Sequence, residues 1–148
     1  MVIPFTSSDV WLLVSIALAE SEPAVGLAEI LFAGDAINKA IFTPQELRRG
    51  LSKLTKAHYV HDAGGIYSLT DTGHSLIADA RKNNRDWLSI WRHIEKRLGA
   101  THGPEDAPQY EDLRFPYPSV TDDGVAEADQ QYRAKFAKLL AELEARDP

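Results

Sequence analysis

The sequence predicts a mainly α-helical protein with one small β-hairpin, followed by additional C-terminal helices. Apolar residues recur at steps of three and four over most of the chain, which is the period of an amphipathic helix. Two short β-type segments flank Gly64 and Gly65, residues that suit the tight turn of a hairpin. The 148 residues, 44% of them hydrophobic, are enough for one domain with a single core.

The first two helices are predicted from their caps and their periodicity. Ser7-Ser8-Asp9 can cap a first helix, and Pro23 limits its extent. Because residues 10–19 are nearly all apolar, we expect this helix at the centre of the core. A second helical pattern runs from Leu27 to Ile41. Gly34 replaces an apolar residue of its stripe, where it either kinks the helix or lets a neighbour approach closely.

The third helix has the clearest start. Thr43-Pro44-Gln45-Glu46 combines an N-cap, a proline at the first helical position and a capping-box glutamate. Leucines at 47, 51 and 54 then form its apolar stripe. The hairpin strands are expected at residues 59–61 and 66–69, and a fourth helix after a cap at Thr70 or Thr72.

The remaining chain divides into three parts. A fifth helix, starting near Arg85, completes a first region of residues 1–98. Residues 99–124 contain four prolines and several acidic residues, and they read as a long connection before a final amphipathic helix in 125–148. The connection also carries Tyr110, Leu113, Phe115 and Tyr117. We expect this segment to lie along the domain surface; the alternative is a peptide offered to a partner.

Two segments resemble a known class of regulator. The segment from Tyr67 to Gly73 has the pattern Tyr-x-Leu-Thr-x-x-Gly and directly follows the Gly-Gly hairpin. It resembles the end of the wing in winged helix-turn-helix transcriptional regulators of the MarR and PadR kind. Residues 47–60 resemble their recognition helix running into the first wing strand. The resemblance covers roughly residues 8–80, and it implies a fold in which the third helix enters the DNA major groove.

The third helix also has a basic face. At 100° per residue, several polar and basic residues fall opposite or beside the leucine stripe, whereas His58 falls on the buried side. Gln and Arg suit base edges, while Lys and Ser suit phosphates. With His61 as the one potential cation of the wing, the predicted DNA-binding residues are Gln45, Arg48, Arg49, Ser52, Lys53, Lys56 and His61. Helix surfaces commonly carry Lys and Arg, so charge alone does not decide for DNA.

Three features favour an alternative, a winged-helix adaptor that binds protein and not DNA: the acidic overall charge, the wing without Lys or Arg, and the aromatic residues of the connection. The net charge is −6, and residues 101–148 carry the whole excess, because residues 1–100 are balanced. An acidic chain repels nucleic acid at long range. In addition, the wing tip Asp62-Ala63-Gly64-Gly65 lacks Lys and Arg.

Other classes of function find no support in the sequence. There is no cysteine, which excludes disulfides and thiolate sites. No nucleophile elbow, phosphate-binding loop or HExxH pattern is present, and His58 and His61 straddle a helix–strand junction. We therefore expect no enzyme, cofactor or metal. The longest apolar stretch, residues 10–19, is too short for a bilayer and lacks a basic start, so we expect a soluble, cytoplasmic protein with no membrane partner.

The final helix predicts self-association. Its apolar residues recur at steps of three and four, and such a stripe is poorly placed in water. We expect it to pack on Trp87 and Trp91 of the fifth helix or on a second subunit. The predicted homodimer interface comprises Trp87, Trp91, Tyr132, Phe136, Leu139 and Leu143.

Overall fold

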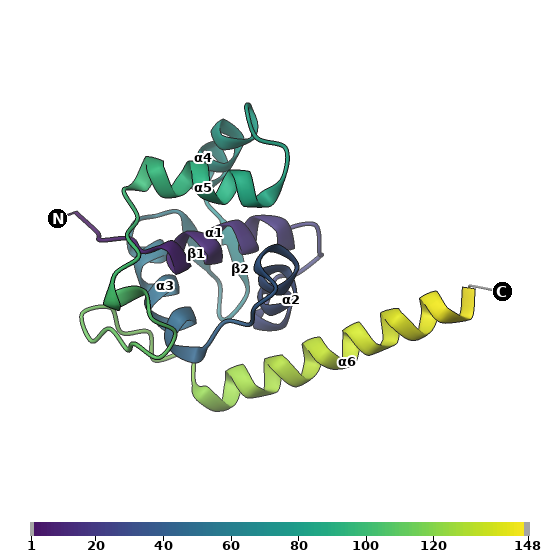
Figure 1. Ribbon diagram of the computed structural model, residues 1–148. Helices are drawn as coiled ribbons and strands as arrows, with labels where there is room; N and C mark the ends of the chain where they lie inside the picture. Colours follow the sequence, from purple (N-terminus) through teal and green to yellow (C-terminus); the bar gives the residue numbers. More distant parts are fainter. Residues whose placement is uncertain (1, 147–148) are drawn as a thin grey trace.

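The fold is mainly helical with one small antiparallel hairpin, as predicted (Figure 1). It is a computed structural model that describes residues 2–146. The elements in chain order are α1 (Ser7–Ala19), α2 (Leu27–Asn38), α3 (Pro44–Lys56), β1 (Val60–Asp62), β2 (Tyr67–Leu69), α4 (Asp71–Arg81), α5 (Trp87–Leu98), the short 3-10 helix η1 (Pro104–Asp106) and α6 (Asp122–Arg146).

Helix α1 lies at the centre of the core, as its composition predicts. Val10, Leu12 and Ile16 have no exposed surface, and α1 packs against α2, α3 and α5. The backbone N–H of Thr6 donates to Asp9 Oδ2 at 2.8 Å, so Asp9 caps the helix that contains it. A helix that is apolar over most of its length thus becomes the element around which the others assemble.

Gly34 serves a close approach and not a kink, because α2 is continuous through it. A Cβ atom at this position would lie 2.4 Å from the ring of Phe42. That ring stacks on Trp11 with 3.6 Å between centroids, and Trp11 Nε1 donates to the Gly34 carbonyl at 3.1 Å. The missing side chain therefore lets two aromatic rings fill the space beside α2.

Helix α3 begins at the predicted capping box and ends earlier than its stripe suggested. Thr43 Oγ1 accepts from the Glu46 N–H at 3.1 Å, and the Glu46 carboxylate accepts from the Thr43 N–H at 3.0 Å. Burial raises the pKa of Glu46. The helix ends at Lys56, and His58 adopts a left-handed φ of 62° and is exposed. The prediction of a buried His58 is therefore wrong, because the chain has already left the helix.

The hairpin pairs β1 and β2 in register, with Val60 opposite Leu69 and Asp62 opposite Tyr67. The glycine of the Tyr-x-Leu-Thr-x-x-Gly motif packs against the start of this hairpin. A Cβ at Gly73 would lie 2.3 Å from the carbonyl oxygen of Tyr59. Thr70 caps α4 by accepting from the Gly73 N–H at 3.1 Å, as predicted.

Helix α6 packs against α2 on the opposite side of the body from α4 and α5 (Figure 1). Tyr132 is buried there, and its ring meets Phe32 edge-on with 5.8 Å between centroids. Trp91 instead packs on Trp11 and donates to the Ser7 carbonyl. The prediction that the last helix packs on Trp87 and Trp91 is therefore wrong, and the two tryptophans share no continuous face with α6.

Candidate functional site

The polar face of α3 is covered by the segment between α5 and α6. We call residues 99–121 the connection; Figure 1 shows it looping over α3 before α6 begins. Two of its apolar side chains, Phe115 and Val120, are buried. Phe115 therefore anchors the connection along the domain surface, as the sequence predicts, whereas Leu113 is 87% exposed.

Arg49 has no exposed surface, and both terminal nitrogens of its guanidinium group are hydrogen-bonded inside the protein. One terminal nitrogen donates to the Tyr110 carbonyl at 2.7 Å. The other donates to the Asp106 carbonyl at 2.9 Å and to Ser8 Oγ at 3.1 Å. Arg49 thus joins α1, α3 and the connection.

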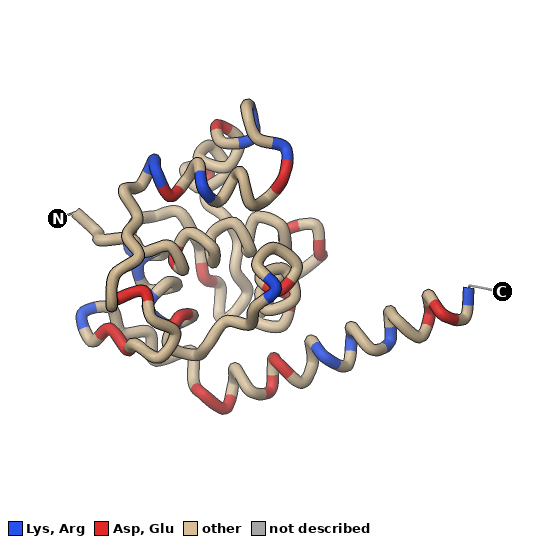
Figure 2. Tube along the Cα trace, viewed as in Figure 1, with Lys and Arg blue, Asp and Glu red and all other residues tan. Residues whose placement is uncertain are grey.

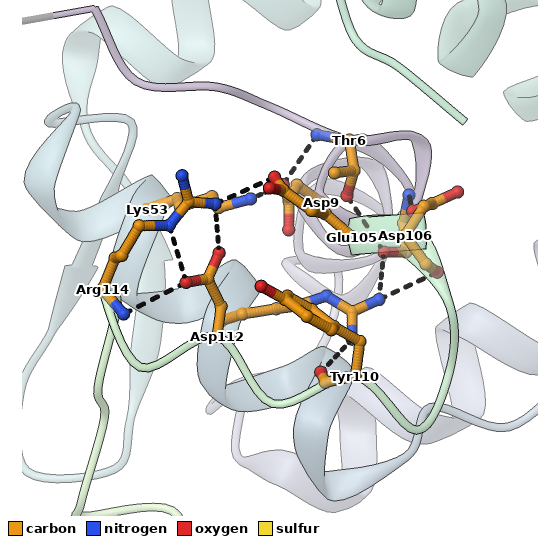
Figure 3. A network of polar contacts seen from close by, with 10 residues as sticks. Thr6, Asp9, Lys53, Glu105, Asp106, Tyr110, Asp112 and Arg114 are labelled. Carbon is orange, nitrogen blue, oxygen red and sulfur yellow. Dashed lines mark hydrogen bonds and ion pairs between the residues drawn. The ribbon is translucent and has the colours of Figure 1, made fainter. Parts of the chain in front are cut away.

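Lys53 is equally buried and forms an ion pair with Asp9 of α1. The two side chains are both 0% exposed, and Lys53 Nζ lies 2.9 Å from Asp9 Oδ2 (Figure 3). The same carboxylate oxygen accepts the Thr6 N–H. The ring of Phe115 lies over the charge, with 5.3 Å from Lys53 Nζ to the ring centroid, and it excludes water from this side.

Arg48 is held by an acidic residue of the connection and by the first residue of α6. Its Nη2 lies 2.6 Å from Glu111 Oε1, and its Nη1 lies 2.8 Å from Asp122 Oδ1. The Glu111 hydrogen bond is the main reason that the pKa of Arg48 is raised. The Arg48 side chain remains only 14% exposed.

The connection also contains an ion pair of its own, between Asp112 and Arg114. Asp112 is buried and accepts Arg114 Nε at 3.0 Å and Arg114 Nη2 at 2.9 Å, a two-pronged pair visible in Figure 3. This bonding holds the pKa of Asp112 below its ordinary value. Arg114 also lies 2.9 Å from Glu105, so the connection is tied to itself as well as to α3.

The structure distributes the seven predicted DNA-binding residues unevenly. The prediction of an exposed face is wrong for Arg49, Ser52 and Lys53, which are buried because the connection and Asp9 supply their surroundings. Gln45 and Arg48 are half-buried, while Lys56 and His61 are exposed. One signal pointed to part of this outcome: two acidic residues of the 101–148 excess, Glu111 and Asp122, form ion pairs with Arg48 of α3.

Sequence reasoning missed an apolar groove on the outer side of the connection. It holds about 270 Å³ and is lined by Arg48, Leu113, Pro116, Tyr117 and Pro118, among others. Leu113 is 87% exposed beside it. Tyr117 is fixed because its hydroxyl donates to Asp62 of β1, and burial raises its pKa. The groove therefore has a positioned wall and a projecting leucine.

Comparisons with known proteins add no relative to this description. A scan against protein-family models and searches of characterised proteins and of solved structures found no match. Within residues 2–146, no three His, Asp or Glu side chains gather in a way that could hold a metal ion. In the same range no helix has the length and apolar character needed to span a bilayer.

Proposed function

We propose that this chain is a winged-helix protein-interaction module that docks a protein partner through the connection side of α3. The observation that carries the proposal is the complete burial of Arg49 and Lys53 beneath the connection. A helix that reads DNA must present side chains to base edges and phosphates. Here both terminal nitrogens of Arg49 and the ammonium group of Lys53 already have hydrogen-bond partners within the chain.

Exposing these cations is energetically expensive. Separating a buried ion pair such as Lys53 and Asp9 costs about 3–5 kcal/mol. Lifting Phe115 from its site adds the loss of a buried aromatic side chain, itself about 3 kcal/mol or more. The net charge of −6 gives no long-range attraction to phosphate that offsets these terms.

The chemistry of the groove indicates the kind of partner. Its lining is mostly apolar, and the exposed Leu113 projects beside prolines 116 and 118. An apolar side chain of a partner would bury this leucine and fill the groove. The hairpin tip lacks Lys and Arg, and the adjacent Ile66, 47% exposed, offers further apolar surface.

The proposal is tested by nuclease-treated affinity purification from the native host, comparing the wild-type chain with Leu113→Asp. The matched control is Leu88→Asp on α5, because Leu88 is also exposed, at 46%, but does not line the groove. We expect a stoichiometric protein with the wild type and with L88D, and its loss with L113D. Recovery of DNA as the sole partner, or of the same protein with all three chains, overturns the proposal.

A DNA-binding transcriptional regulator is the second candidate, favoured by a specific feature of Arg48. Glu111 and Asp122 bind it through carboxylate oxygens, which DNA phosphates can replace in the same geometry. Arg48 and Arg49 would then join the exposed Lys56 on the surface of α3 once the connection opened, while Lys53 would stay paired with Asp9 of α1. This candidate predicts that the double variant Glu111→Gln, Asp122→Asn binds random duplex at low salt, with affinity falling steeply as salt rises. The protein-interaction proposal predicts no binding by wild type or variant.

A further inference from the structure

The distal half of α6 extends away from the body (Figure 1). In residues 133–146 the structure gives two side-chain contacts to the body: Lys135 Nζ lies 3.4 Å from Glu22, and the Phe136 ring lies 6.4 Å from the Phe32 ring. From residue 137 to 146 every side chain is exposed. A 14-residue helix is about 21 Å long, so a substantial part of α6 stands in solvent.

This half-helix carries an apolar stripe that nothing in the described chain covers. Phe136 is 45% exposed and Leu143 is 59% exposed, and Leu139 and Leu140 lie between them on the same face. The stripe continues inward to the buried Tyr132. Beside Tyr132, a groove of about 260 Å³ lies between α2 and α6, lined mainly by apolar side chains. Stripe and groove form one surface.

The charges along α6 indicate what covers that surface. Figure 2 shows acidic residues at the start of α6, basic residues in its middle and acidic residues again toward its end. Lys135 precedes Glu142 by seven residues, so both lie on the same flank of the stripe. A copy of this helix laid in the reverse direction brings its Glu142 to the level of Lys135. The surface is thus complementary to itself, which is the property of a two-fold interface.

We propose that the distal half of α6 docks against the same segment of a second copy of this chain, in antiparallel orientation. Knobs-into-holes packing then sets Phe136 against Leu139 of the second copy, and Tyr132 against Leu143 of the second copy. The same register places Lys135 beside Glu142 of the second copy, twice by symmetry. Leu143 of the second copy also reaches the groove next to Tyr132. A single register therefore buries the apolar stripe, fills the groove and pairs the charges.

The opposite orientation does not fit the charges. In a parallel pair the lysines at 135 lie at the same level, and so do the glutamates at 142, so the attractive pairs are lost. Two heptads alone are short for a stable coiled coil. Because the groove adds contact area to the helix pair, we expect a dimer with a dissociation constant on the order of micromolar. This interface uses the side of the body away from the connection groove, and it holds whichever partner α3 and the connection meet.

The test is sedimentation velocity of the full chain over a wide concentration range. We expect a monomer–dimer equilibrium, abolished by Phe136→Asp. Lys135→Glu and Glu142→Lys are each expected to raise the dissociation constant about fivefold, because each removes two symmetric pairs and adds repulsion. An equimolar mixture of these two variants regains wild-type affinity, since the mixed dimer contains only Lys–Glu pairs.

The matched control is Lys138→Glu, which makes the same charge change on the far side of the helix from the stripe. It is expected to leave the dissociation constant within about twofold of the wild type. Circular dichroism checks that each variant keeps its helix content. A chain that stays monomeric at all concentrations, a dimer that is insensitive to F136D, or a variant mixture that does not recover overturns the proposal.

Discussion

At the scale of single residues, the Lys53–Asp9 pair decides whether α3 has a free polar face. Removing one partner leaves the other charge buried without compensation. We therefore predict that Lys53→Met lowers the free energy of unfolding by about 3–5 kcal/mol. The double variant Asp9→Asn, Lys53→Met removes both charges and is expected to regain most of that loss. Urea unfolding at neutral pH measures the free energy of unfolding of the wild type, the single variant and the double variant.

Lys138→Met is the control for the loss of a lysine, because residue 138 is exposed on α6 and substitutions there are expected to stay within about 0.5 kcal/mol. A loss below about 1 kcal/mol for K53M would contradict the buried pair, since an exposed ion pair contributes about that much at most.

Gly34 gives a second prediction at this scale. A Cβ in Gly34→Ala would meet the Phe42 ring at 2.4 Å, and that ring is fixed by its stacking on Trp11. Overpacking costs about 1–3 kcal/mol and the gain in helix propensity returns up to about 1, so we expect a net loss of about 1–2 kcal/mol. Gly103→Ala is the control, because a Cβ there meets nothing within 4 Å. Thermal unfolding compares the two variants; equal melting temperatures would contradict the close approach.

At the scale of elements, the sequence predicts what local signals encode. The capping box from Thr43 to Glu46 and the glycine pair of the hairpin act over a few residues, so α3 and the strands lie where they were expected. Local signals do not encode the packing partner of α6. Its stripe fits the aromatic residues of α5 as well as Phe32 of α2, and periodicity does not choose between two apolar surfaces.

The contact of α6 with α2 predicts a titration. The Tyr132 hydroxyl donates to Asp35, and burial raises the Tyr132 pKa to about 12. Its unfolded pKa is about 10. Because the folded value is higher, this tyrosine contributes stability below pH 10, and the contribution is lost as pH rises from 10 to 12. The ionisation of Tyr132 is measured as the difference in absorbance at 295 nm between the wild type and Tyr132→Phe. This difference separates it from the ionisation of Tyr67, whose pKa is also raised to about 12.

A difference titration with a midpoint near 12 supports the α2–α6 contact, whereas a midpoint near 10 contradicts it. Phenylalanine keeps the ring contact with Phe32, so Y132F is expected to retain its helix content at neutral pH, which circular dichroism checks.

At the scale of the whole molecule, the covering of α3 is the feature that periodicity missed. The connection has no repeat to interpret, because it is rich in proline and its contacts run through single side chains. Arg49, for example, reaches carbonyl oxygens 57 and 61 residues further along the chain. Helical-wheel reasoning assigned the α3 cations to solvent because it considers one helix at a time. The actual surroundings of these cations depend on contacts with the connection, which lies much further along the chain. The acidic excess of residues 101–148 suggests such contacts but does not identify the residues that make them.

The connection is expected to open as a separate unit when its main anchor is removed. Phe115 is buried over the Lys53 ammonium, so Phe115→Ala removes about 3 kcal/mol or more of contact energy from this unit. Amide hydrogen exchange measures the result. The Phe115 and Val120 amides, which donate within the connection to Asp112 and Tyr117 carbonyls, are expected to exchange about 100-fold faster. Leu113→Ala, at a residue 87% exposed, is the control and leaves these rates unchanged. The amides of α1 decide the interpretation. If their hydrogen exchange accelerates as much as that of the connection amides, the connection opens only when the whole core unfolds. In that case α3 cannot expose its polar face while the core stays folded.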